Sequence, residues 1–174
     1  AVTFTGSSAT GSKIMEVASK SVKPLSFELG GKNAAIVFSD ADIEAAVKGV
    51  VRSVFSNSGQ ICLCTERVYV QQDIFDSFVS RLTEAVQALS FDDSSEKSLT
   101  LGPLISRDQR DKVLSYFDLA IKEGATAIIG GAVPHFGDER DDGFYVQPSV
   151  FTGVPKHSRF VREEIFGPVC HIEK

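Results

Sequence analysis

A cysteine placed just after a sharp turn is the first candidate for chemistry in this sequence. Cys62 lies between a helix pattern that ends near Ser56 and an alternating strand pattern over residues 66–71. Gly59 gives the backbone the freedom to turn between the two. A thiol held at the rim of a cleft by rigid flanking elements can act as a nucleophile. Most free cysteines are small buried hydrophobes instead, so Cys62 taken alone leaves both interpretations open.

A glutamate in an apolar setting is the second candidate. Glu28 lies between Phe27 and Leu29 and precedes Gly30 and Gly31, where another group can approach the backbone closely. A carboxylate in such a place should be partly desolvated, as general bases often are. The simpler alternative is a glutamate that pairs with a nearby lysine or caps a turn.

The beginning of the chain predicts a turn that could hold a phosphate. Residues 2–4 favour a strand and residues 14–21 favour a helix, with a turn rich in Gly and Ser between them. A helix that begins after such a turn presents free N–H groups and the positive end of its dipole. Gly6, Ser7 and Gly11 are the candidate residues, although an ordinary capped turn is more common for this pattern taken alone.

Periodicity along the rest of the chain predicts the elements that must position these residues. Helical spacing of apolar residues covers residues 43–55, 75–89 and 113–121. Strand patterns cover residues 34–38, 66–71, 127–129 and 169–172, and the first of these is typical of a fully buried strand. Residues 91–100 are polar and predict a surface loop. Because strands alternate with helices, we expect an α/β fold with three layers, a mostly parallel sheet carrying helices on both faces.

Composition excludes several classes of function. The chain has 174 residues, a net charge of −5 and no basic run, which disfavours nucleic acid and anionic membranes as partners. No apolar run is long enough to span a bilayer, and no signal peptide is visible. Three cysteines are an odd number, which suits a reducing compartment, so we expect a cytoplasmic protein without disulfides. No His/Cys cluster has the spacing of a metal site, so no metal is expected.

Four motifs in this order resemble the NAD(P)-dependent aldehyde dehydrogenase superfamily. They are Phe4-Thr5-Gly6-Ser7-Ser8-Ala9-Thr10-Gly11, Glu28-Leu29-Gly30-Gly31-Lys32, Gly59-Gln60-Ile61-Cys62, and Glu163-Glu164-Ile165-Phe166-Gly167-Pro168-Val169. The resemblance covers the whole chain. It also indicates that the chain is a piece of a larger protein, about a third of a family member and one domain's worth of residues.

The resemblance implies a role for each motif. Cys62 matches the catalytic thiol, Glu28 matches the base that activates the hydrolytic water, and Cys64 is a structural neighbour. The remaining matches are to cofactor-binding positions for NAD, with NADP not excluded. Those positions fall near the pyrophosphate (Gly6, Ser7, Gly11), along the nicotinamide (Leu29, Gly30) and at the nicotinamide ribose (Glu164, Phe166).

The resemblance also implies the organisation of the protein. Residues 1–27 are expected to end a nucleotide-binding domain, and residues 28–174 to form a catalytic domain that is incomplete at its C-terminal side. The complete enzyme is expected to be a homo-oligomer, a dimer or a tetramer, and the 174-residue piece alone is expected to be inactive. Within the superfamily, residues 59–70, 138–148 and 167–172 look most like enzymes that oxidise 2-hydroxymuconate or 2-aminomuconate semialdehyde. A generic aliphatic or aromatic aldehyde dehydrogenase is the alternative.

Two other classes of protein remain open at this point. A cysteine hydrolase would also use Cys62, but it needs a histidine base, and His135, His157 and His171 lie in no recognisable setting for one. A non-catalytic relative would keep the scaffold and lose Glu28 or Cys62, and both residues are present.

Overall fold

The chain folds into two compact units in the computed structural model, which describes residues 1–91 and 99–174. The first unit is Ala1–Gly31 and the second is Lys32–Lys174. The division falls after Gly31 rather than after Phe27 because Glu28 and Leu29 complete a strand of the first unit. Assignment of the first unit to a nucleotide-binding domain remains a prediction. Most of the predicted loop at 91–100 lies outside the described residues.

The first unit is a strand–helix–strand crossover. Strands β1 (Val2–Gly6) and β2 (Leu25–Leu29) pair in parallel, and helix α1 (Ser8–Ser19) connects them. Alternate residues of both strands are half-buried, and the rings of Phe4 and Phe27 meet edge to face at 6.1 Å. The predicted strand, turn and helix at the start of the chain are therefore present.

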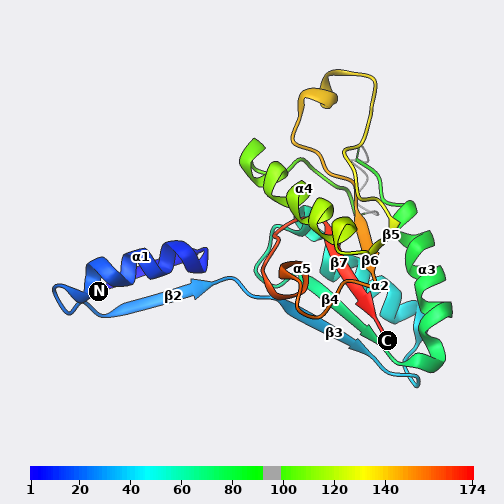
Figure 1. Ribbon diagram of the computed structural model, residues 1–174, viewed down its shortest axis with the longest axis horizontal. Coiled ribbons are helices and arrows are strands. Elements are labelled where there is room, and N and C mark those ends of the chain that lie inside the picture. Colours follow the sequence, from blue (N-terminus) through cyan, green and yellow to red (C-terminus); the bar gives the residue numbers. More distant parts are fainter. Residues whose placement is uncertain (92–98) are drawn as a thin grey trace. The chain divides into compact units, whose positions relative to one another are not determined.

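The second unit is built on a five-stranded sheet with the order β3-β4-β7-β6-β5 (Figure 1). Its strands are β3 (Asn33–Val37), β4 (Thr65–Val70), β5 (Thr126–Ile129), β6 (Ser149–Thr152) and β7 (Val169–Glu173). Every neighbouring pair is parallel except β5 with β6, which is antiparallel. The last strand in the sequence, β7, lies in the middle of the sheet because crossovers carry the chain away from its sequence neighbours.

The helices that flank this sheet in the described part of the chain are α2 (Ile43–Phe55), α3 (Phe75–Gln87), α4 (Arg107–Lys122) and α5 (Arg159–Arg162). Short 3-10 turns cover Ser56–Gly59 (η1), Gln72–Ile74 (η2) and Glu139–Asp142 (η3). The Asp42 carboxylate accepts a hydrogen bond from the Ala45 N–H, and the Ser106 hydroxyl accepts one from the Gln109 N–H. Each side chain thus caps a free backbone N–H group in the first turn of its helix, α2 or α4. No helix within the described ranges has the length and apolar content that a membrane crossing requires.

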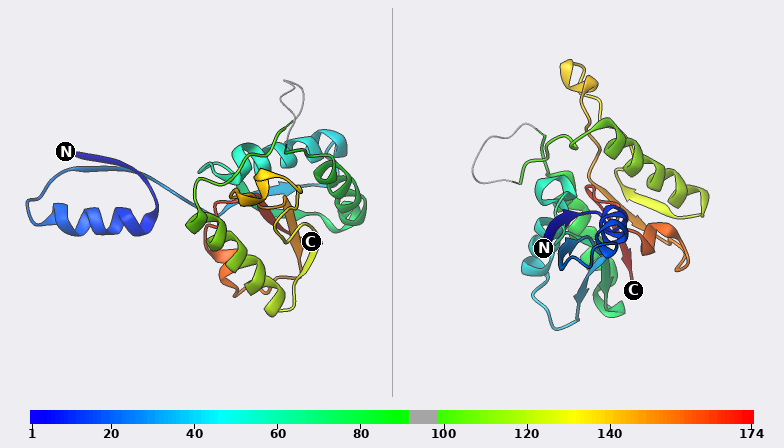
Figure 2. Two further views of the ribbon diagram at one scale, coloured as in Figure 1. Left: turned by 90° about the horizontal axis from the view of Figure 1, so that it is seen from above. Right: turned by 90° about the vertical axis from the view of Figure 1, so that its left-hand side faces the viewer.

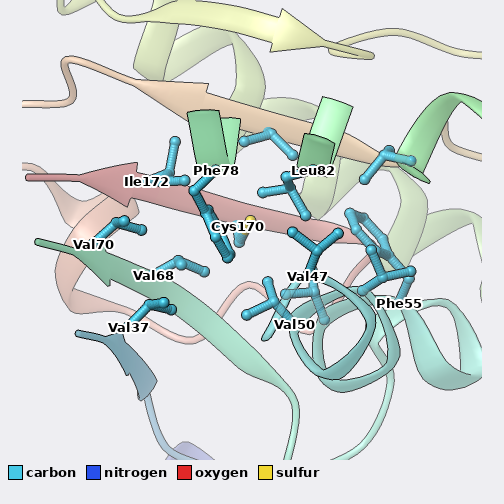
Figure 3. Close-up of a cluster of buried hydrophobic side chains, with 14 of the residues drawn as sticks. Val37, Val47, Val50, Phe55, Val68, Val70, Phe78, Leu82, Cys170 and Ile172 are labelled. Atoms are coloured by element: carbon cyan, nitrogen blue, oxygen red, sulfur yellow. The ribbon is translucent and has the colours of Figure 1, made fainter. Parts of the chain in front are cut away.

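The helices form layers on both sides of the sheet, as Figure 2 shows. Valines of β4 and Cys170 and Ile172 of β7 pack with α2 and α3 in one cluster of buried side chains (Figure 3). Phe151 of β6 and Val169 of β7 belong to a second cluster with α4 and α5. Strands β6 and β7 thus send alternate side chains to opposite layers. The predicted α/β fold with three layers is confirmed.

The prediction of a fully buried strand at 34–38 is wrong. Among the residues that the structure describes, β3 pairs with β4 alone and is therefore at the edge of the sheet. Val37 is buried, whereas Ile36 and Phe38 are 65% and 61% exposed. Apolar composition did not distinguish the edge of the sheet from its centre, because only the pairing order decides which strand has two neighbours.

Candidate active site

Cys62 follows a tight turn in which the position of Gly59 leaves no room for a side chain. After α2 ends at Phe55, Asn57 and Ser58 take left-handed conformations and Gly59 has φ = 74°. A Cβ on Gly59 would stand 1.9 Å from the carbonyl oxygen of Gly167. Only glycine fits such an approach. The predicted need for glycine at this turn is confirmed.

Two polar side chains anchor the turn through three hydrogen bonds. Nδ2 of Asn33 donates to the carbonyl oxygens of Cys62, at 2.6 Å, and Cys64, at 3.2 Å. The Ser58 hydroxyl donates to the Gly102 carbonyl at 2.8 Å. These bonds fix the backbone around the thiol, as a nucleophile that must meet its substrate in one geometry requires. Asn33 was not identified from sequence; its only signal is a polar residue that opens a strand after two glycines.

The three cysteines differ in access and in chemistry. Cys62 is exposed, whereas Cys64 and Cys170 are buried. Burial raises the pKa of the Cys170 thiol to about 12 and also raises the pKa of Cys64. The Cys64 sulfur lies 3.7 Å from the Ser56 carbonyl and helps to close the turn. Since the thiolate is the reactive form, Cys62 is the cysteine best placed to attack a substrate.

The segment with Glu164 and Phe166 lies against the Cys62 turn, because Gly59 packs on the backbone of Gly167. Both side chains are half-buried, and Phe166 has φ = 62°. The structure therefore brings together two of the motifs that sequence analysis singled out, although they are about a hundred residues apart.

Glu163, which precedes this segment, is held by two side chains. Nε and Nη2 of Arg159 donate to its carboxylate at 2.9 and 2.8 Å, and the Tyr116 hydroxyl donates to it at 2.6 Å. These bonds lower the pKa of Glu163 to about 2. Burial and the bond to Glu163 raise the pKa of Tyr116 to about 12. At neutral pH the carboxylate is charged and the phenol is protonated, which keeps the network intact.

The first unit places its candidate residues side by side. Gly6 of β1 pairs with Leu29 of β2, and a Cβ on the buried Gly11 would stand 3.0 Å from the Leu29 side chain. Ser7 is the N-cap of α1, and its hydroxyl accepts from the Thr10 N–H at 3.2 Å. An exposed glycine–serine turn at the start of a 12-residue helix suits an anion.

Partial burial of Glu28 was expected, and that expectation is wrong for this chain. Glu28 is exposed, because β2 has a single strand neighbour and alternate residues of the strand point away from the half-buried face. Gly30, which follows β2, is half-buried. The expected role of Glu28 as a base requires that its carboxylate can reach water, and an exposed carboxylate can.

The histidines give Cys62 no base. His135 is exposed and lies 2.9 Å from a carboxylate oxygen of Asp141. His171 is buried in β7, and its Nδ1 has no hydrogen-bond partner. No hydrogen bond joins Cys62 to a histidine within residues 1–91 or 99–174. Across the same residues, no group of three or more His, Cys, Asp or Glu side chains is arranged to hold a metal ion.

Comparison with known proteins agrees with the motifs. The profile described as the Aldehyde dehydrogenase family matches residues 1–174. The chain is 58% identical to a 2-aminomuconic 6-semialdehyde dehydrogenase from Pseudomonas sp, over 99% of the chain and 35% of that protein. It is 51% identical to a 2-hydroxymuconic semialdehyde dehydrogenase from Pseudomonas sp. (strain CF600), with the same coverage.

A solved structure has a fold that closely resembles that of the chain. A betaine aldehyde dehydrogenase from Staphylococcus aureus, in complex with NAD+, matches with a TM-score of 0.93 and 39% identity. The match covers 99% of this chain and 34% of that one. The chain thus spans about a third of the length of the relatives it matches.

Limited alkylation should label Cys62 first. At pH 8 the thiol of Cys170, with a pKa of about 12, is almost entirely protonated, and both Cys64 and Cys170 are buried. Iodoacetamide at substoichiometric amounts, followed by mass-spectrometric peptide mapping, should place nearly all of the label on Cys62. In the Cys62→Ala variant the remaining labelling should be slow. Faster labelling of Cys64 or Cys170 in the unchanged chain would show that the accessible thiol has been misassigned.

Proposed function

Because this chain belongs to the aldehyde dehydrogenase family, we propose that the protein containing it oxidises an aldehyde to the carboxylate with NAD+. The observation that carries the proposal is the packing of the Cys62 turn on the segment with Glu164 and Phe166. The contact between Gly59 and Gly167 therefore holds the exposed thiol of Cys62 close to a candidate cofactor-binding segment.

The first step belongs to Cys62. Its thiolate attacks the aldehyde carbon, so a C–S bond forms and the carbonyl oxygen becomes an oxyanion. The backbone N–H of Cys62 is a donor for that charge. The bonds from Asn33 to the carbonyls of Cys62 and Cys64 keep the turn from reorganising during the step. Bound NAD+ supplies the acceptor for the hydride that leaves the same carbon, and the thioester of Cys62 remains.

The second step belongs to Glu28. A water molecule loses a proton to this carboxylate and attacks the thioester carbon, after which the C–S bond breaks. The acid leaves, and the thiolate returns to Cys62. Glu28 is exposed and therefore open to water.

The residues of the chain suit the chemistry of a dinucleotide. The exposed turn at Gly6 and Ser7 leads into the start of α1, whose N–H groups bind anions such as a pyrophosphate. Gly11 and Leu29 pack together and support that turn, and Leu29 and Gly30 would line the nicotinamide. In the second unit, the carboxylate of Glu164 can accept hydrogen bonds from ribose hydroxyls, and Phe166 offers a ring beside them.

The proposed substrate is 2-aminomuconate or 2-hydroxymuconate semialdehyde. Identities of 58% and 51% to dehydrogenases named for these compounds support it. A betaine aldehyde dehydrogenase of Sinorhizobium fredii is 43% identical, so a broader aldehyde dehydrogenase is the alternative. We also propose a cytoplasmic location, because the three cysteines are free thiols as in a reducing compartment. A homo-oligomeric complete protein is proposed from the family resemblance alone.

Substitution of Glu28 should separate the two steps. In the full-length protein, Glu28→Gln should leave acylation and NADH formation intact while slowing thioester hydrolysis by about 10² to 10⁴. Stopped-flow absorbance at 340 nm should show a burst of NADH and then a slow steady state. Cys62→Ala is the control and should show no burst. Unchanged turnover in Glu28→Gln would remove Glu28 from the mechanism.

Substrate preference should be strong. A semialdehyde that carries a remote carboxylate should be preferred over hexanal by about 10² or more in kcat/KM, because a site built to pair a charge rejects analogues without it. The measurement is initial NADH formation by the full-length protein with each aldehyde. Equal efficiency with hexanal would leave only the broader aldehyde dehydrogenase.

A further inference from the structure

Phe166 holds a conformation that needs support from its surroundings. Its φ of 62° lies in the left-handed region, which bulky side chains rarely adopt. Such residues persist where neighbouring groups over-determine them, and they cluster at ligand sites. The neighbours of Phe166 are therefore candidates for a role in positioning.

Glu66 binds the N–H side of this segment. Its carboxylate accepts from the Ile165 N–H at 3.0 and 3.1 Å and from the Phe166 N–H at 2.9 Å, and it also pairs with Lys32. The Glu66 side chain is 5% exposed. A buried carboxylate with two backbone donors and a cation has its acceptor sites occupied, so it has little freedom to move.

A bulge in the sheet explains how Glu66 reaches the segment. Asn33 of β3 pairs with Thr65, whereas Ala34 pairs with Arg67, so Glu66 is the extra residue on β4. Val68 and Val70 of β4 point toward α2 and α3, and Glu66 contacts Ile165, which belongs to the opposite cluster. Bulges re-aim side chains in this way, often beside active sites.

Gln109 binds the carbonyl side of the same segment. Its Nε2 donates to the carbonyl oxygens of Ile165 at 3.0 Å and Phe166 at 2.9 Å. Gln109 lies in the first turn of α4, where the Ser106 cap fixes its backbone. Glu66 and Gln109 thus hold the same two residues, one through their N–H groups and the other through their carbonyls.

We propose that Glu66 and Gln109 are positioning residues, which keep Phe166 left-handed and thereby present Glu164 and Phe166 to the nicotinamide riboside half of a dinucleotide. The inference rests on the proposed function. Neither residue touches the reacting atoms. Each acts through the backbone between α5 and β7, and the bonds from Arg159 and Tyr116 to Glu163 secure the other side of Glu164.

The test is the isosteric variant Gln109→Glu in the full-length protein, because a carboxylate cannot donate to two carbonyls. The KM for NAD+ should rise about tenfold, as expected when the two hydrogen bonds that hold the segment are lost. The kcat for aldehyde oxidation should fall, and the isotope effect with a deuterated aldehyde should increase as hydride transfer slows. Gln109→Ala removes the donors without adding repulsion and should shift KM in the same direction.

Hydrolysis of p-nitrophenyl acetate without NAD+ separates positioning from a general structural role. This ester acylates a thiolate directly, so its turnover reports on Cys62 and the deacylating base with no hydride step. It should stay within about twofold of the unchanged protein in both variants of Gln109. Gln71→Glu is the matched control, since Gln71 is exposed and its side-chain oxygen accepts from the Ser39 N–H, which a carboxylate can also do. The kinetic constants of this variant should be unchanged.

The outcomes distinguish the two proposals. A parallel fall of ester hydrolysis and aldehyde oxidation in both variants, with a lower Tm, would overturn the positioning role, as would an unchanged KM for NAD+ and an unchanged isotope effect. Absence of NADH formation by the unchanged protein with every aldehyde tried, together with no NAD+ binding by calorimetry, would overturn the proposed function and this inference with it.

Discussion

The close approach of two backbones governs the arrangement of the second unit. The 1.9 Å that would separate a Gly59 Cβ from the Gly167 oxygen means that the turn before Cys62 and the loop before β7 share one van der Waals surface. Because protein interiors are packed without slack, a shift of either segment displaces the other. The thiol and the residues proposed to face the cofactor are thereby kept in a fixed relation, although the thiol lies between η1 and β4 and the other residues lie between α5 and β7. Such a relation is what hydride transfer between two bound groups demands.

Buried charge supports that contact. Lys32 and Glu66 are 9% and 5% exposed, and burial lowers the pKa of Lys32, an effect that Glu66 opposes. The free energy gained from a buried ion pair is often cancelled by the loss of hydration, so the pair is weak support for stability as such. The pair instead fixes the conformation of the loop before β7, since the Glu66 carboxylate can accept from two backbone N–H groups only if the loop takes one conformation. Gln109 restricts the same loop from its other side, because its amide donates to the Ile165 carbonyl oxygen.

Sequence reasoning succeeded where local rules apply and failed where distant pairing decides. The helical period of residues 43–55 and the turn at Gly59 follow from local backbone chemistry and are present. The burial assigned to residues 34–38 and to Glu28 was wrong because strand neighbours, which no local pattern encodes, set exposure. Glu66, Asn33 and Gln109 were missed for a related reason. Glu66 meets Phe166 across 100 residues, and a glutamate in an alternating strand gives no sign that a bulge will turn it inward.

The most direct test of the account is to trap the acyl intermediate. The full-length protein is mixed with a muconic semialdehyde and NAD+, quenched in acid within one turnover and mapped by mass spectrometry. The account predicts one acyl group, carried as a thioester on Cys62, and no such adduct when NAD+ is left out, because the thioester forms only after hydride has left the carbon. An acyl group on any other residue, or a Cys62 thioester that forms equally well without NAD+, would contradict it.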